Sequence, residues 1–359
     1  MEFDVQLRVS EVVIRFESVV REARILSPLK NFESVSQLIE HRWDPLTRRN
    51  AIVIKGRMDY VRRFIDSDPE FLRELVQSTQ ADCPFCPGAV FSKSPKFTPE
   101  IAPEGRIHVG EAVCFPSLFA HNDYNAIVVP SPSHSLGLNE FTPRILADGL
   151  RACLVFLERV RAVSPESMYP AIILNFLPPA GSTISHMHMQ ALASEVPLQS
   201  IAELLEASKA YFDRVGSSFW KDLLETEQRL GSRYLGRTGN IHWLSPYAPY
   251  GLNEVQAIVP NKCNLQQLTT DDVEALMNGV LKVLQFYYDA GVRSFNGALY
   301  SGPLGEANDY FDLNFRIVSR YGYKARFVSD VWALQYLLGE REIYEAPEET
   351  CLKLRKYFE

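Results

Sequence analysis

The sequence lacks the features that mark several large classes of protein. It contains no run of about eighteen apolar residues, and no basic segment followed by an apolar stretch opens it, so we predict neither a membrane helix nor a secretory signal. The 37 basic residues are outnumbered by 44 acidic ones, and the net charge of −7 disfavours general binding to nucleic acid or to anionic membranes. We therefore expect a cytoplasmic protein with no nucleic-acid or membrane partner.

Common phosphate-binding signatures are also missing, and cysteine is scarce. Neither a Walker loop nor a Gly-x-Gly-x-x-Gly sequence follows an expected strand, which argues against kinase-type and Rossmann-type phosphate sites. Of the six cysteines, only Cys83 and Cys86 are close together in the chain. This usage is typical of a reducing compartment, in which a cysteine pair binds metal or does redox work.

Two stretches of the chain repeat one order of expected elements. In residues 112–194 and again in residues 241–319, a strand precedes a long helix, and two further strands follow it. Such self-similarity indicates an internal duplication. We predict an α+β fold of two repeats, each an antiparallel sheet with a packed helix.

The predicted repeats divide the chain into five parts. Residues 1–80 are expected to hold an N-terminal helix over 3–26, where apolar residues recur at helical spacing, and a lead-in segment. Residues 81–200 then form the first repeat, which carries the candidate chemistry, and residues 201–235 form a connecting helix. Residues 236–320 form the second repeat, and residues 321–359 form a C-terminal segment.

The densest functional pattern is a run of two histidines and an amide, each separated by one methionine. On a strand, alternation places His186, His188 and Gln190 on one face, with Met187 and Met189 on the other. The chain has only seven histidines, so this spacing argues against two incidental surface residues.

A turn of small residues lies immediately before this run. Gly181, Ser182 and Thr183 offer N–H groups and hydroxyls that can cradle phosphate oxygens. Most turns of this composition only connect elements, so the turn is weak evidence without its neighbours.

Cys83 and Cys86 have the spacing of half a zinc site. A tetrahedral zinc ion needs two further ligands, and we propose His134 and His186, which would leave His188 free. The alternative is a thioredoxin-like redox pair, but that motif expects a preceding strand and a helix that opens through it. A closed Cys₂His₂ site would make the zinc structural.

These motifs together resemble the galactose-1-phosphate uridylyltransferase branch of the histidine-triad superfamily. Residues 41–57 resemble that family's R-x-(D/N)-P-L-T segment, and Cys-Pro-Phe-Cys with His134 resembles its zinc ligands. The run from His186 to Gln190 resembles its His-Pro-His-x-Gln motif. The resemblance implies two histidine-triad-like repeats, a homodimer, and a Zn²⁺ ion.

The resemblance also implies a role for each matching residue. It makes His186 a metal ligand, His188 the nucleophile and Gln190 a phosphate contact. The other implied substrate contacts are Asn175, which matches the active-site asparagine, and Asn122 and Asp123 near the nucleoside. Arg316 and Arg320 are candidates for the sugar-phosphate end.

The chemistry of these residue types supports nucleotidyl transfer independently. A neutral imidazole is nucleophilic near pH 7, so His188 can attack the α-phosphorus of a nucleotide sugar. Phosphate leaving groups need little protonation, and a glutamine amide holds an oxygen without donating a proton to a leaving group. We predict a nucleotidyltransferase that passes a nucleoside monophosphate between a nucleotide sugar and a sugar 1-phosphate.

Two alternatives stay open at this point. The uridylyltransferases carry a lysine where this chain has Phe176, which leans towards a phosphorylase that uses inorganic phosphate on a nucleotide sugar or dinucleotide. A zinc-stapled nucleotide-binding protein without turnover is the second. In the second repeat, Asp312, Asn314 and Arg316 stand in place of the histidine run, so that half is predicted to have no nucleophile.

Overall fold

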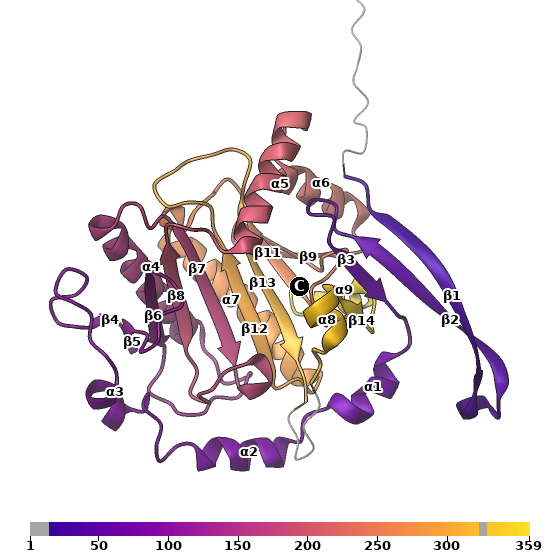
Figure 1. Ribbon diagram of the computed structural model, residues 1–359, viewed down its shortest axis with the longest axis horizontal. Helices are drawn as coiled ribbons and strands as arrows, with labels where there is room; N and C mark the ends of the chain where they lie inside the picture. The colour runs from indigo at the N-terminus through magenta and orange to yellow at the C-terminus, as the bar shows by residue number, and fades with distance from the viewer. Residues whose placement is uncertain (1–13, 323–328) are drawn as a thin grey trace, which may run out of the picture.

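The computed structural model describes residues 14–322 and 329–359, and a ten-stranded antiparallel sheet organises them (Figure 1). The first half of the chain contributes β4 (Ile107–Val109), β5 (Ala112–Pro116), β6 (Tyr124–Val129), β7 (Tyr169–Phe176) and β8 (Met189–Ser194). The second half contributes β9 (Tyr234–Thr238), β10 (Ile241–Leu244), β11 (Val255–Val259), β12 (Ser294–Tyr300) and β13 (Leu313–Arg320).

The strand order of this sheet is symmetric about its centre. It runs β4-β5-β6-β8-β7-β12-β13-β11-β10-β9, so each half has the same internal order and β7 pairs with β12 in the middle. Ile173 of β7 lies opposite Ala298 of β12, Gln190 lies opposite Ile173, and Arg316 lies opposite Ala298. The predicted fold class of two antiparallel repeats is confirmed, with the two sheets joined edge to edge.

Two long helices pack on one face of this sheet. They are α4 (Pro143–Val163) and α7 (Thr270–Asp289), and each buries one apolar side in the main core. Gly149 of α4 lies so close to Met189 that a Cβ atom would stand 3.0 Å from the methionine methyl group. Among the described residues, no helix has the length and apolar character needed to span a membrane.

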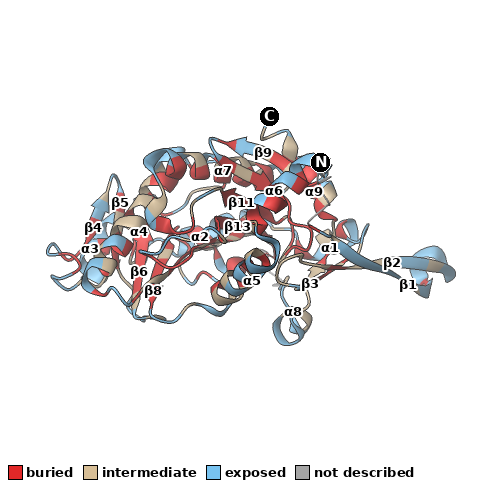
Figure 2. Cartoon of the chain, turned by 90° about the horizontal axis from the view of Figure 1, so that it is seen from above, coloured by how far each residue is buried: buried red, intermediate tan, exposed pale blue. Residues whose placement is uncertain are grey.

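The opposite face is covered only at its two ends. Helices α5 (Gln199–Val215) and α6 (Phe219–Leu230) pack on β10 and β11, on the other side of the sheet from α7 (Figure 2). At the other end, Phe85 and the start of α3 (Pro87–Lys93) pack on β5 and β6. Side chains between these covers are half-buried, namely Ile173, Asn175, Gln190, Asn296 and Ala298.

The predicted N-terminal helix is wrong where the structure describes it. Residues Glu17–Ser27 form β1, which pairs in full with β2 (Glu33–Trp43) to make a protruding hairpin. Val19, Val20 and Ile25 are β-branched and favour a strand once a partner is present, a long-range effect that helical spacing cannot register. Residues 3–13 of the predicted helix lie outside the described part of the chain.

A small second sheet is formed by three strands from the N-terminal part of the chain and one from the C-terminal part. Its order is β1-β2-β3-β14, in which β3 (Asn50–Val53) and β14 (Glu342–Ile343) are parallel. The remaining helices are α1 (Met58–Ile65), α2 (Pro69–Ser78), α8 (Ala333–Leu338) and α9 (Pro347–Arg355), with single 3₁₀ turns at η1 (Pro28–Lys30), η2 (Pro178–Ala180) and η3 (Leu265–Gln267).

The connecting segment is two helices and not one. Gly216 adopts a left-handed conformation with φ of 78° and ends α5, and Gly231 ends α6 in the same way. Glycine adopts this conformation without a Cβ penalty, so the chain turns at Gly216 and α6 begins a few residues later.

Candidate active site and metal centre

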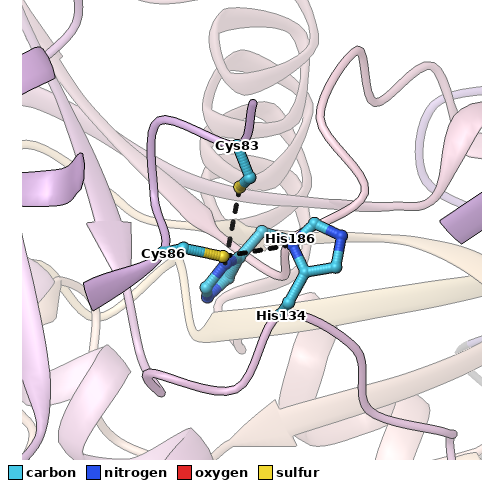
Figure 3. Close-up of side chains that lie close together, drawn as sticks. All are labelled: Cys83, Cys86, His134 and His186. Atoms are coloured by element: carbon cyan, nitrogen blue, oxygen red, sulfur yellow. Dashed lines mark hydrogen bonds between the residues drawn. The ribbon is translucent and has the colours of Figure 1, made fainter. Parts of the chain in front are cut away.

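The four predicted metal ligands converge at one point. Cys83, Cys86, His134 and His186 place their ligand atoms within 4.8 Å of one another (Figure 3). Nδ1 of His186 lies 3.7 Å from each cysteine sulfur, and Nδ1 of His134 lies 3.4 Å from Sγ of Cys86. Segments before α3, after β6 and before β8 supply these ligands, so a metal ion bound here would tie three parts of the first repeat together.

Hydrogen bonds at the far side of each imidazole orient both histidines. Nε2 of His186 donates to the carbonyl of Ser131 at 2.9 Å, and Nε2 of His134 donates to the carbonyl of Val76 at 3.0 Å. A proton on Nε2 leaves the Nδ1 lone pair free for a metal, which is the usual arrangement around a histidine ligand. The donor set of two sulfurs and two nitrogens therefore fits a tetrahedral metal ion.

The raised pKa of one thiol in the cysteine pair disfavours a redox role. Burial, together with the neighbouring Cys83, raises the pKa of the Cys86 thiol to about 11. Redox cysteines have a lowered pKa, because the thiolate is the reactive form. The same burial suits a metal site, where the ion displaces the proton.

His188 lies beside this centre with a fixed tautomer. Its Nδ1 donates to the carbonyl of His186 at 2.9 Å, so Nε2 carries the free lone pair. The edge of the ring meets Phe85 at 5.3 Å between centroids. Burial lowers the pKa of His188, so the ring is neutral and nucleophilic near pH 7.

His188 is only 7% exposed, and its Nε2 has no hydrogen-bond partner among the described residues. This atom is not among the fully buried polar atoms that lack a partner. Nε2 therefore keeps contact with solvent.

The predicted alternation holds through the histidine run. Met187 and Met189 lie in the core under α4, whereas His186 and His188 both face Phe85. Gln190 continues the run in β8, on the half-buried part of the open face. Phe176 points into the helix-covered core and stacks on Phe295, so this position faces away from His188.

Asn175 is the nearest predicted contact on the neighbouring strand. Leu174 pairs with Met189 in antiparallel register. The next residues along the pair are Asn175 and His188, which therefore lie opposite each other on one face of the sheet. The Asn175 carboxamide accepts a hydrogen bond of 2.6 Å from Asn296 of the second repeat. Asn296 is not among the site residues predicted from the sequence.

The predicted phosphate cradle at residues 181–183 needs correction. The N–H groups of Gly181 and Ser182 donate to the carbonyls of Pro178 and Leu177, and the Ser182 hydroxyl donates to the carbonyl of Ile184. These donors hold the loop and are not available to a ligand. Gly181 and Thr183 are both exposed, and Thr183 alone of the three makes no hydrogen bond to a described residue.

Three other predicted contacts lie away from His188. Asp123 accepts from the hydroxyl of Ser194 and from the amide of Glu195, at the opposite end of β8. The intervening strand is about 20 Å long at roughly 3.3 Å per residue, so Asp123 and the adjacent Asn122 do not reach the histidine. The chain therefore uses Asp123 to fasten β6 to the end of β8.

Arg316 is part of a buried ion pair. Its Nη1 donates to Glu254 at 2.7 Å, and both side chains are almost fully buried. It lies three strands from Gln190, which is about 14 Å at roughly 4.8 Å per strand. The prediction of a free substrate-binding cation at Arg316 is not supported, because Glu254 neutralises its charge. The guanidinium instead occupies the place in the second repeat that Gln190 has in the first.

Comparison with known proteins agrees with this architecture. No family model matches the chain. An uncharacterized protein of Archaeoglobus fulgidus is 28% identical over 344 residues, which cover 96% of this chain and 98% of that protein. ADP-glucose phosphorylase of Arabidopsis thaliana is 24% identical over 274 residues, which cover 69% of this chain and 74% of that enzyme.

Solved structures extend the similarity to almost the whole fold. The crystal structure of Arabidopsis thaliana ADP-glucose phosphorylase with bound ADP-glucose matches with a TM-score of 0.67 at 17% identity, and covers 89% of this chain and 99% of that one. A uridylyltransferase structure matches with a TM-score of 0.63 at 18% identity, covering 82% and 98%. The chain has the galactose-1-phosphate uridylyltransferase-like fold. The predicted resemblance is confirmed at the level of the fold.

The second repeat of this uridylyltransferase-like fold carries a buried carboxyl at the place of His186. Asp312 stands four residues before Arg316, as His186 stands four residues before Gln190. Burial raises the pKa of Asp312 to about 7, although its Oδ1 accepts the amide of Asn261 at 3.0 Å. No metal cluster surrounds it in the described residues.

Asp312→Asn is expected to stabilise the protein several times more at pH 8 than at pH 4.5. The unfolded carboxyl loses its proton near pH 4 and the folded one near pH 7, so ionisation of the native Asp312 costs stability as pH rises between these values. The full cost is at most about 4 kcal/mol, from roughly three pKa units. Thermal unfolding of both proteins at the two pH values measures it, and an equal difference at both would contradict the buried, protonated carboxyl.

Proposed function

We propose that this protein is a nucleotidyltransferase that works through a covalent intermediate on His188. The observation that carries the proposal is the His188 ring itself, with Nδ1 bonded to the carbonyl of His186 and Nε2 not bonded to any described residue. A neutral imidazole held in this tautomer directs its one lone pair outwards. The substrate would be a nucleotide sugar or, in the related alternative, a dinucleotide.

The reaction then proceeds in two displacements. In the first, Nε2 of His188 bonds to the α-phosphorus, and the bond from that phosphorus to the bridging oxygen breaks. The electron pair leaves with the sugar 1-phosphate, whose second pKa near 6 lets it depart as a dianion without a proton donor. In the second, a phosphate oxygen of the acceptor bonds to the phosphorus and the bond to Nε2 breaks.

The residues around His188 support both steps without proton transfer. The carbonyl of His186 accepts from Nδ1 and stabilises the positive charge that the ring gains when Nε2 forms its bond. Gln190 and Asn175 are amides, which bind non-bridging oxygens and release no proton. Phe85 covers one edge of the ring and limits the access of water to the intermediate.

We propose that the Cys₂His₂ cluster holds Zn²⁺. Two cysteine sulfurs and two Nδ1 atoms form a donor set of the kind found in closed structural zinc sites. The ion would supply a crosslink and no chemistry on the substrate. Cys83, Cys86 and His134 would thereby hold His186, and with it the carbonyl that orients His188.

The acceptor defines two candidate reactions. A sugar 1-phosphate as acceptor gives a uridylyltransferase-like exchange, which the resemblance of residues 41–190 favours. Inorganic phosphate as acceptor gives a phosphorylase, and the similarity to ADP-glucose phosphorylase over 69% of this chain favours it. Phe176 no longer separates these reactions, because it faces the core.

We further propose that the protein forms a homodimer. The β1–β2 hairpin carries exposed apolar side chains, including Leu26, Leu29, Phe32 and Leu38, along an arm that extends away from the rest of the chain (Figure 2). A second copy would cover such surface. Light scattering on the purified protein gives the mass that tests this.

We also propose a cytoplasmic location. All six cysteines are free thiols in the structure, and two of them belong to the proposed zinc site. This usage suits a reducing compartment.

Incubation with nucleotide sugars labelled at the α-phosphorus tests the proposed function. ADP-glucose and UDP-glucose are each expected, if accepted, to leave acid-labile, base-stable label on the protein, as a phosphorus–nitrogen bond requires. Released product then separates the acceptors, because inorganic phosphate yields a nucleoside diphosphate and a hexose 1-phosphate yields a new nucleotide sugar. Binding of both nucleotides without any label would instead indicate a nucleotide-binding protein without turnover.

A further inference from the structure

The second repeat reaches into the candidate active site through one side chain. Asn296 of β12 donates from Nδ2 to Oδ1 of Asn175 at 2.6 Å and to the carbonyl of Ala180 at 2.7 Å. The first acceptor lies beside His188, and the second begins the loop at residues 180–183. Asn296 is therefore bonded both to the predicted active-site asparagine and to the loop that precedes the histidine run.

The polarity of these bonds is fixed by chemistry at both ends. Nη1 of Arg320 lies 2.6 Å from Oδ1 of Asn296, and a guanidinium can only donate. The carbonyl of Ala180 can only accept. Asn296 must therefore present its oxygen to Arg320 and its NH₂ group to Ala180 and Asn175.

This constraint passes to the next amide. Because Asn175 accepts from Asn296 with Oδ1, its own NH₂ group points elsewhere. No described residue accepts a hydrogen bond from that NH₂ group, and it is not among the buried atoms that lack a partner. Its two N–H bonds are available to an anionic oxygen next to His188.

A partly buried ion pair anchors the other end of the chain of bonds. Nε and Nη2 of Arg320 both donate to Asp330, at distances from 2.7 to 3.0 Å. The two side chains are 18% and 8% exposed, so the pair is shielded from solvent. A bidentate pair of this kind holds the guanidinium in one orientation.

We propose that Asn296 and Arg320 are positioning residues for nucleotidyl transfer. They set the carboxamide of Asn175 so that it donates to a non-bridging oxygen of the phosphorus under attack, and they hold the loop that begins at Ala180. The second repeat has no nucleophile of its own, but in this proposal it contributes to the reaction through these two residues. This inference rests on the proposed function of His188 and assigns new residues to it.

Kinetics of the first displacement test the assignment. In Asn296→Ala and in the isosteric Asn296→Asp, which cannot donate to Asn175, single-turnover labelling by saturating ADP-glucose or UDP-glucose is expected to slow about 10- to 100-fold. The nucleotide concentration for half-maximal labelling should change less than about three-fold, because ground-state binding is retained. Arg320→Lys keeps a donor and should retain more activity than Arg320→Met.

A double-mutant cycle shows whether Asn296 acts through Asn175. The Asn175→Ala, Asn296→Ala double variant is expected to label no more slowly than about two- to three-fold below Asn175→Ala alone. Asn253→Gly is the matched control. Its amide also donates to two oxygens, those of Ser319 and Tyr321, and glycine tolerates its φ of 51°. Full additivity, or equal slowing in Asn253→Gly, would overturn the proposal.

Hydrogen exchange gives a readout that needs no substrate. Loss of the bond to the Ala180 carbonyl should speed backbone amide exchange across residues 177–184 by about ten-fold in Asn296→Ala, and not in Asn253→Gly. Unchanged exchange in this segment would overturn the proposal even in a protein that turns over. Absence of label on the wild-type protein with altered exchange in Asn296→Ala would instead reject the His188 reaction and retain the structural linkage.

Discussion

Replacing His188 with glycine is expected to abolish covalent labelling and to lower turnover by at least about a thousand-fold. The substitution removes the only group that the proposed first displacement uses as a nucleophile. It leaves the carbonyl of His186, the metal ligands and the Gln190 amide in place. Nucleotide binding should therefore persist while the bond to phosphorus no longer forms.

Labelling and binding must be measured on the same preparation. Acid-labile label from an α-labelled nucleotide sugar reports the covalent step, and calorimetry with the unlabelled nucleotide reports binding. His108→Gly is the matched control, since His108 is an exposed histidine of β4 that stacks on Phe91. A His188→Gly protein that still accumulates label would reject this histidine as the nucleophile.

The repeated architecture was predictable because it is written in local patterns. Each repeat has a capped helix with one apolar side, preceded and followed by short strands at similar positions. The two helices are α4 and α7, which pack on one face of the sheet. The hairpin formed by Glu17–Ser27 and Glu33–Trp43 was not predictable from such patterns. Its strands depend on pairing with each other, and the spacing of apolar residues in Glu17–Ser27 is compatible with either a helix or a strand.

The convergence of the four candidate metal ligands was also predictable, since the residue types that bind zinc restrict the choice. Few histidines are available to complete a Cys-x-x-Cys pair, and two of them meet it in space. The bonds of Asn296 were not predictable, because an asparagine in a strand carries no sign of its partner 121 residues away. Arg316 was misjudged for the same reason, as its neutralising Glu254 lies 62 residues away.

Cys86→Ser is expected to remove the metal, destabilise the protein and lower activity by at least about a hundred-fold. Serine is a poor zinc ligand. Substitutions of residues that only hydrogen-bond to a metal ligand already cost about 10- to 100-fold in metal affinity or activity, so the loss of a ligand should cost at least as much. A metal contribution of about 3 kcal/mol would lower the melting temperature by roughly 4 °C in a protein of this size. Loss of the metal should also lower activity. The segments that carry Phe85 and His186 would no longer be crosslinked, and both of these residues contact His188.

Metal content, melting temperature and labelling rate of each variant separate a structural metal from one that acts on substrate. Cys263→Ser is the matched control, because Cys263 is buried in the second repeat and its thiol donates to the carbonyl of Glu306, which a serine hydroxyl can also do. It should keep the metal and label normally. If the zinc is structural, the melting temperature and the labelling rate of Cys86→Ser should both be lower than in the wild-type protein. Stoichiometric zinc retained in Cys86→Ser, or a metal-free protein with normal melting and normal labelling, would show that the four converging side chains do not hold the strand that presents His188.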